Sequence, residues 1–72
     1  MNRYRQTLRV GDRKVVTTAN KRFHVAYPTT PGKLKVSKRT DSTKAVLAEA
    51  RRLRRIGLVP AYVFDRGERI AP

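Results

Sequence analysis

Cysteine and tryptophan are absent from this chain of 72 residues, which has only one histidine and five acidic residues. Without cysteine there can be no disulfide framework, no thiolate metal site and no cysteine nucleophile. One histidine and five scattered carboxylates are also poor material for a zinc site or for a hard-cation site. No glycine-rich phosphate-binding motif is present. The sequence therefore predicts no metal and no cofactor.

Long apolar runs are also missing. The longest runs from Leu58 to Phe64 and is interrupted by Pro60, whereas a bilayer-spanning helix needs about 20 residues. The first five residues are not followed by the apolar segment of a secretory signal. We therefore expect a cytoplasmic protein that does not enter a membrane.

Side chains suited to catalysis are scarce. Nucleophilic catalysis needs an oriented base, and His24 is the only imidazole. Asp12, Asp41 and Asp65 lie at predicted turns or caps, where Asp has an ordinary structural use. Glu49 lies in the middle of a predicted helix, where we expect weak, exposed pairing with nearby arginines. We expect that the protein is not an enzyme.

Positive charge is what the chain has in excess, because 18 Lys and Arg against 5 Asp and Glu give a net charge of +13. Self-repulsion at this density destabilises the compact state, and a polyanionic partner would relieve it. Most of these cations are arginine, whose planar fork suits phosphate and guanine. Hydrophobic residues still make up 39% of the chain, which predicts a folded core.

The first half of the sequence predicts a set of short strands. Residues 4–10 alternate in polarity, residues 11–13 suit a turn, and residues 14–19 are rich in β-branched side chains. We place a two-residue turn at Asn20-Lys21 and count the pairing with the next strand outward from it. That register gives a core face of Val16, Thr18, Phe23, Val25 and Tyr27, and an outer face of Val15, Thr17, Arg22, His24 and Ala26.

The second half begins with a loop at residues 28–32 and a strand at residues 33–39, in which basic and apolar residues alternate. A helix is predicted from about residue 43 to 56, with Asp41 or Ser42 as its N-cap and Gly57 at its end. Its apolar stripe is predicted to contain Val46, Ala50 and Leu53, widened by Ile56 or Leu47.

Residues 58–64 suit a short strand, and Pro60 would place the start of that strand at a sheet edge. Residues 66–72 are expected to form a loose tail. The sequence thus predicts one small domain over residues 1–72, of the α+β class. Its antiparallel sheet would have three to four strands with one packed helix, and a possible short C-terminal strand.

The basic residues are segregated in this scheme. Several would share the outer sheet face, and others lie on the helix, where they also complement the helix dipole. A solvated polar face is the simpler interpretation, but the net charge favours phosphate contacts. The candidate nucleic-acid-binding residues are Arg5, Arg9, Arg22, His24, Lys33, Lys35, Arg39, Lys44, Arg51, Arg52 and Arg55.

Residues 22–57 resemble the arm-type DNA-binding domain found at the amino end of many phage and transposon integrases. The resemblance lies in the strand 22–27, the Pro/Gly loop, the basic strand 33–39 and the opening of the helix at Thr43-Lys44-Ala45. It implies a three-stranded sheet that enters the major groove, with outward residues of both strands reading bases. It also implies a free-standing binder, such as a small phage accessory or regulatory protein.

We therefore expect a small DNA-binding regulatory module. Four of the five aromatic side chains, all except Tyr4, are expected to pack in the core, which favours duplex DNA over single strands. An RNA- or ribosome-associated protein is the first alternative, which composition does not separate from DNA binding. The second is a protein-interaction module, such as a phage-type inhibitor docking on an acidic host protein. In that case the strand 58–64 would offer an exposed edge to the partner or to a second copy of the chain.

Overall fold

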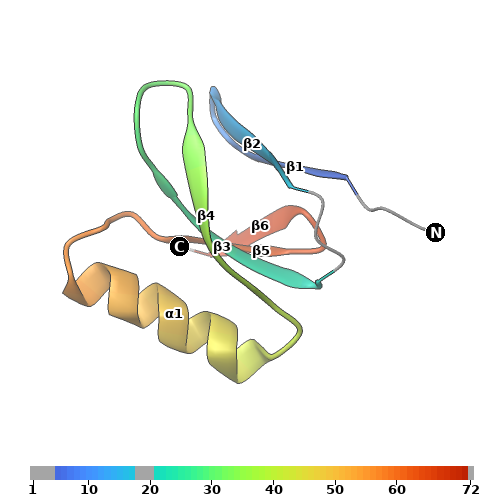
Figure 1. The fold of residues 1–72 in the computed structure, drawn as a ribbon, viewed down its shortest axis with the longest axis vertical. Helices are drawn as coiled ribbons and strands as arrows, with labels where there is room; N and C mark the ends of the chain where they lie inside the picture. The colour runs from blue at the N-terminus through green and yellow to red at the C-terminus, as the bar shows by residue number, and fades with distance from the viewer. Residues whose placement is uncertain (1–4, 18–20, 72) are drawn as a thin grey trace.

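The computed structural model describes residues 5–17 and 21–71 and has an α+β fold (Figure 1). Its elements are β1 (Gln6–Val10), β2 (Arg13–Thr17), β3 (Phe23–Pro28), β4 (Leu34–Thr40), α1 (Thr43–Arg55), β5 (Tyr62–Asp65) and β6 (Glu68–Ala71). The strands form a two-stranded antiparallel sheet, β1-β2, and a four-stranded antiparallel sheet in the order β4-β3-β5-β6. The predicted class, a sheet of up to four strands with one helix, is confirmed.

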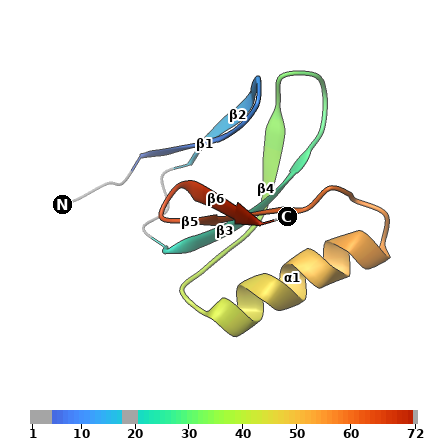
Figure 2. The same cartoon turned by 180° about the vertical axis from the view of Figure 1, so that it is seen from behind.

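The fold has three layers, with the four-stranded sheet between α1 and the β1-β2 hairpin (Figures 1 and 2). The first core lies between α1 and the sheet and includes Phe23, Val25, Val46, Ala50, Leu53, Ala61 and Val63. The second lies between the hairpin and the sheet and is made by Leu8, Ala26, Leu34 and Phe64. Since β1 contacts β6 and β2 contacts β4, the hairpin lies over the sheet from edge to edge.

The predicted pairing of β2 with β3 is wrong. Both edges of β3 are occupied, by β4 on one side and β5 on the other. Strand β2 instead pairs with β1 through the turn at Gly11-Asp12, while Asn20 of the expected turn lies outside the described residues. The reason is the apolar match with β5, which sets Val63 beside Val25. A strand buried on both faces gains more from such partners than from a nearby polar strand.

Because the predicted pairing is wrong, one residue expected in the core is exposed and several expected on the outer face are buried. Val16, expected in the core, is 55% exposed, and Ala26, expected on the outer face, is completely buried. Thr17 is also buried, and Val15 packs against the second core. Phe23, Val25 and Tyr27 do pack in the first core, as predicted, and Thr18 lies outside the described residues.

A β-bulge interrupts the alternation of β4. Val25 of β3 opposes Lys38 and Ala26 opposes Val36, so Ser37 has no opposite residue. An extra residue of this kind moves the side chains after it to the other face of the sheet. Lys35 and Lys38 therefore lie on the face of the sheet that packs against α1, whereas Arg39 lies on the opposite face. The single basic face predicted for residues 33–39 does not exist.

Helix α1 forms where the sequence predicts it. The Ser42 hydroxyl accepts a hydrogen bond from the Ala45 N–H at 3.1 Å, so Ser42 is the N-cap. Gly57, at φ 89°, ends the helix with its N–H bonded to the Arg54 carbonyl at 3.2 Å, and the Leu58 N–H bonds the Leu53 carbonyl at 2.9 Å. The stripe of Val46, Ala50 and Leu53 is buried as predicted, but Leu47 and Ile56 do not widen it and are 48% and 56% exposed.

The C-terminal segment differs most from the prediction. Strand β5 is not an edge strand, because it lies between β3 and β6. Residues 68–71, expected as part of a loose tail, form β6. The connecting residues Arg66 and Gly67 have φ values of 52° and 86°, which is the two-residue turn that matches the twist of a hairpin.

Candidate nucleic-acid interface

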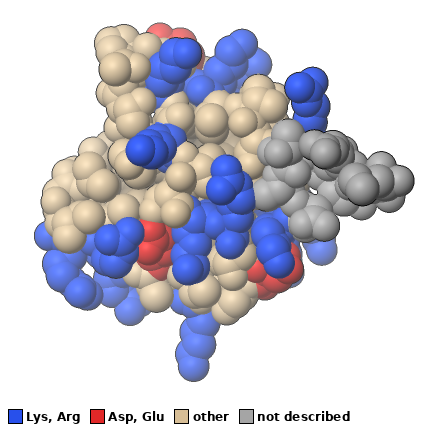
Figure 3. Space-filling model, viewed as in Figure 1, with Lys and Arg blue, Asp and Glu red and all other residues tan. Residues whose placement is uncertain are grey.

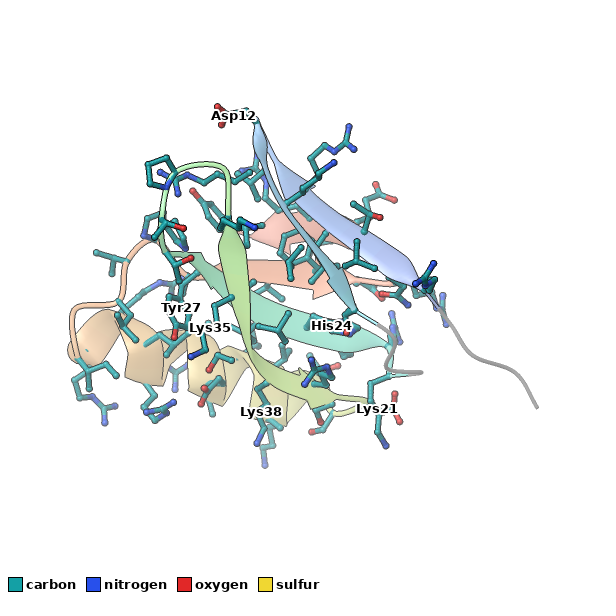
Figure 4. All side chains as sticks on the ribbon, turned by 45° about the horizontal axis from the view of Figure 1, so that its top comes forward. Asp12, Lys21, His24, Tyr27, Lys35 and Lys38 are labelled. Atoms are coloured by element: carbon teal, nitrogen blue, oxygen red, sulfur yellow. The ribbon has the colours of Figure 1, made fainter. Side chains whose placement is uncertain are left out.

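The sheet face expected to bind nucleic acid is covered by the hairpin. His24, predicted on that face, is completely buried, and Figure 4 shows it on β3 near the end of β2. Neither ring nitrogen has a hydrogen-bond partner among the described residues. The prediction that His24 faces a ligand is therefore wrong. Burial, together with the nearby positive charge of Arg39, lowers the pKa of this imidazole below its ordinary value.

Acid should therefore destabilise the fold through His24. In the unfolded chain the imidazole takes up a proton near its ordinary pKa of 6.5, whereas in the folded chain it stays neutral to lower pH. The free energy of unfolding should therefore decrease as the pH is lowered from 7.5 to 5.5. The His24→Leu variant should show a smaller change of unfolding free energy with pH. At pH 7.5 it should be as stable as the wild type, because the substitution removes an unsatisfied polar group. Urea unfolding at both pH values tests this, and an unchanged slope in the variant would contradict it.

Two of the predicted contact residues are held by carboxylates. Arg22 donates to Asp65 at 2.8 and 3.0 Å and lies over the Phe23 ring, 4.7 Å from its centroid. Arg52 donates to Glu49 at 2.8 and 2.7 Å. The two pairs lower the pKa values of both carboxyl groups, that of Glu49 to about 2. These two cations are thus largely neutralised locally and are poorer phosphate ligands.

Glu49 is more than the weak, exposed partner expected. Its side chain is only 11% exposed, and it also accepts a hydrogen bond from the hydroxyl of Ser37, the residue at the bulge of β4. One carboxylate thus joins the helix to the sheet edge. Hydrogen bonds to a charged group contribute about 1.5–3 kcal/mol, so Glu49 has a structural role.

The outer side of the β1-β2 hairpin carries an exposed basic surface, which we call the hairpin face. Arg9 of β1 lies directly opposite Lys14 of β2, and the backbone of Lys14 forms an isolated parallel β-bridge with Lys33 of the β3-β4 loop. Like charges placed directly opposite one another destabilise a sheet. The fold gains nothing from this row of cations. The hairpin face consists of Arg5, Thr7, Arg9, Lys14 and Val16, with Lys33 beside them, and all six are exposed.

Hydrogen bonds to backbone carbonyls join the tip of the hairpin to the β3-β4 loop. The Lys14 N–H donates to the Gly32 carbonyl at 3.3 Å, and the Arg13 guanidinium donates to the Thr30 carbonyl at 3.1 Å. These contacts hold Lys33 next to the hairpin. Asp12 is the carboxylate at the tip (Figure 4), and it makes no ion pair with the described residues.

A second basic surface follows the outer side of α1, and we call it the helix ridge. Its members are Lys44, Arg51, Arg54 and Arg55, all exposed. None of them is ion-paired among the described residues. Figure 3 shows many Lys and Arg side chains over α1 and β4, with small patches of Asp and Glu among them.

The predicted site residues thus divide between several places. Arg5, Arg9 and Lys33 meet on the hairpin face, and Lys44, Arg51 and Arg55 meet on the helix ridge. Lys35 lies on the helix side of β4, and the guanidinium of Arg39 donates to the hydroxyl of Thr17 at 3.1 Å. The list of candidate residues omitted Lys14, and also Arg54, which belongs to the basic run 51–55 of the predicted helix. Counting outward from the turn at residues 11–12 would have found Lys14, since that register sets it against Arg9.

The described residues offer little for other functions. They contain no group of three or more His, Asp or Glu side chains that would hold a metal ion. Within the same part of the chain, no helix has the length and apolar character needed to cross a membrane. Comparisons with protein-family models, with curated proteins and with solved structures find no match to this chain.

Proposed function

We propose that this protein binds duplex DNA through the hairpin face. The observation that carries the proposal is the row of Arg9, Lys14 and Lys33, which costs folding stability and has no carboxylate partner among the described residues. Phosphates would relieve the repulsion within this row, and the release of their counterions would supply affinity.

The shape of the hairpin supports the duplex DNA ligand. A two-stranded antiparallel ribbon fits the major groove of B-form DNA. The second core holds the ribbon against the sheet through Leu8, which is completely buried. Arg5 and Arg9 are four residues apart on one face, about 13 Å along a strand. Cations spaced in this way would contact phosphates while the middle of the ribbon enters the groove.

The middle of the hairpin face would read bases in this mode. Thr7 lies opposite Val16, between the basic positions, and the side chain of Val16 is 55% exposed. An exposed apolar side chain is suited to the methyl group of thymine, and a threonine hydroxyl bonds donors or acceptors. These two residues give the proposed DNA-binding site a means of sequence preference.

RNA remains the alternative ligand, and the geometry favours DNA over it. The major groove of A-form RNA is deep and narrow, so that a ribbon does not enter it. An RNA- or ribosome-associated protein would instead use its cations without groove insertion. The protein-interaction alternative loses its sequence cue, since β5 has neighbours on both sides. A regulatory role and a cytoplasmic location remain parts of the proposal.

A salt titration tests the proposal. Binding of the intact protein to a random-sequence duplex is measured between 50 and 300 mM salt, with structured RNA as the competitor. About four neutralised phosphates predict a slope of about −4 for log affinity against log salt. Preference for DNA with this slope supports the proposal. A flat slope, or stronger binding to structured RNA throughout the range, would contradict it.

A further inference from the structure

We propose that the helix ridge is a second duplex-binding surface, so that one molecule bridges two segments of DNA. This inference rests on the proposed function, because the first duplex is the one bound at the hairpin face. The ridge would contact phosphates only, without reading bases.

The spacing of the ridge suits an extended polyanion. Lys44, Arg51 and Arg55 occupy positions i, i+7 and i+11, which fall on one side of a helix. They extend over about 16 Å of helix length. Ala48 lies between them on the same side and is also exposed, and its small side chain leaves the approach to the cations open.

The stability of the helix explains only part of the ridge, because Arg54 and Arg55 in the last turn complement the helix dipole but Lys44 and Arg51 do not. Lys44 lies in the first turn, where a cation interacts unfavourably with the helix dipole. The helix contains one carboxylate, Glu49, which is already held by Arg52 and Ser37. Arg51 and Arg55 therefore have no acidic neighbour on α1 to pair with. As on the hairpin face, these cations lie close together without carboxylate partners that would stabilise the fold.

The two surfaces point in opposite directions. The hairpin and α1 pack against opposite faces of the four-stranded sheet, and Figures 1 and 2 show them on either side of it. The hairpin face and the helix ridge are the outer sides of these two layers. A straight duplex bound along one of them does not reach the other, so occupation of both requires a second segment of DNA.

The experiment measures capture of one duplex by another. A biotinylated duplex on beads is saturated with the protein, washed, and offered a fluorescent duplex at 0.1 M salt. The ridge variant is Lys44→Gln, Arg51→Gln and Arg55→Gln. The control variant is Lys21→Gln, Lys38→Gln and Arg66→Gln, which removes the same charge from exposed positions outside both surfaces. Binding of each protein to a single duplex is measured in parallel.

We expect the wild-type and control proteins to capture the second duplex, and the ridge variant to capture at least about tenfold less of it, because the loss of three phosphate contacts weakens the affinity of the ridge by on the order of a hundredfold. The ridge variant should still bind a single duplex within a fewfold of the control. Capture by the ridge variant equal to that of the control would overturn the proposal, because bridging would then come from self-association. Normal binding of a single duplex without capture by the wild type would also overturn it. Absence of binding to any duplex would instead reject the proposed function.

Discussion

Replacement of Arg9, Lys14 and Lys33 by alanine should weaken binding to duplex DNA by on the order of a hundredfold at 0.1 M salt. The loss follows from the three phosphate contacts removed, each of which also lowers the slope of log affinity against log salt by about 0.9. The same variant should be at least as stable as the wild type, because the facing pair of Arg9 and Lys14 is repulsive. Fluorescence anisotropy and urea unfolding measure the two effects.

The matched control for this experiment carries Lys21→Ala, Lys38→Ala and Arg66→Ala. It has the same net charge as the hairpin-face variant but keeps both basic surfaces intact. Its affinity should stay within about threefold of the wild type, since charges outside the contact region act only through a screened long-range field. If both variants lose affinity equally, binding depends on net charge alone and the hairpin face has no special role.

Leu8→Ala should destabilise the protein by about 2–5 kcal/mol, because it empties the centre of the second core. Leu8 is completely buried and packs with Ala26, Leu34 and Phe64. Domains of this size have a total stability of only about 5 kcal/mol or a little more. The variant should therefore be partly unfolded at 37 °C and should lose DNA binding with its hairpin. Thermal unfolding followed by circular dichroism measures the effect.

Val16→Ala is the control for the core experiment. Val16 lies on the same hairpin but is 55% exposed, so its truncation should change stability by less than about 0.5 kcal/mol. A loss for Leu8→Ala that is no larger than the loss for Val16→Ala would mean that the hairpin does not pack on the sheet as described.

Local signals in the sequence predicted the local structure well. The helix has an N-cap at Ser42, a buried stripe and an end at Gly57, and all of them are readable from residues a few positions apart. The alternation of residues 6–10 similarly predicts which side of β1 is buried, since Leu8 is buried while Arg9 is exposed. In both cases the hydrophobic period and the turn residues fix the answer without a distant partner.

The choice of strand partners was not readable in this way. Phe23, His24, Val25 and Ala26 are all buried, which identifies a strand covered on both faces. Its alternation nevertheless suited a half-buried strand in a simple hairpin. The deciding partner, β5, is distant in sequence, and the packing of Val63 against Val25 becomes visible only in three dimensions.

The predicted position of the nucleic-acid-binding surface was wrong for the same reason, because it depended on the predicted strand pairing. The sequence indicated the cations correctly as an unusual excess, but the bulge at Ser37 and the cover over β3 decide where they lie. A bulge has no strong local signal, because it adds one residue to a strand without changing its composition. The residues of the predicted basic face therefore lie on both sides of the sheet. The exposed basic surface lies instead on the outer side of the β1-β2 hairpin.

The central claim is that duplex DNA lies against the hairpin face. A titration of the isotopically labelled protein with a short duplex, followed by amide chemical shifts, tests it most directly. When only a small fraction of the protein has bound DNA, we predict that the amide shifts change most at Thr7, Arg9, Lys14, Val16 and Lys33. Shift changes along α1 should follow when the duplex is in excess. Changes confined to α1, or changes spread evenly over all exposed cations, would contradict the claim.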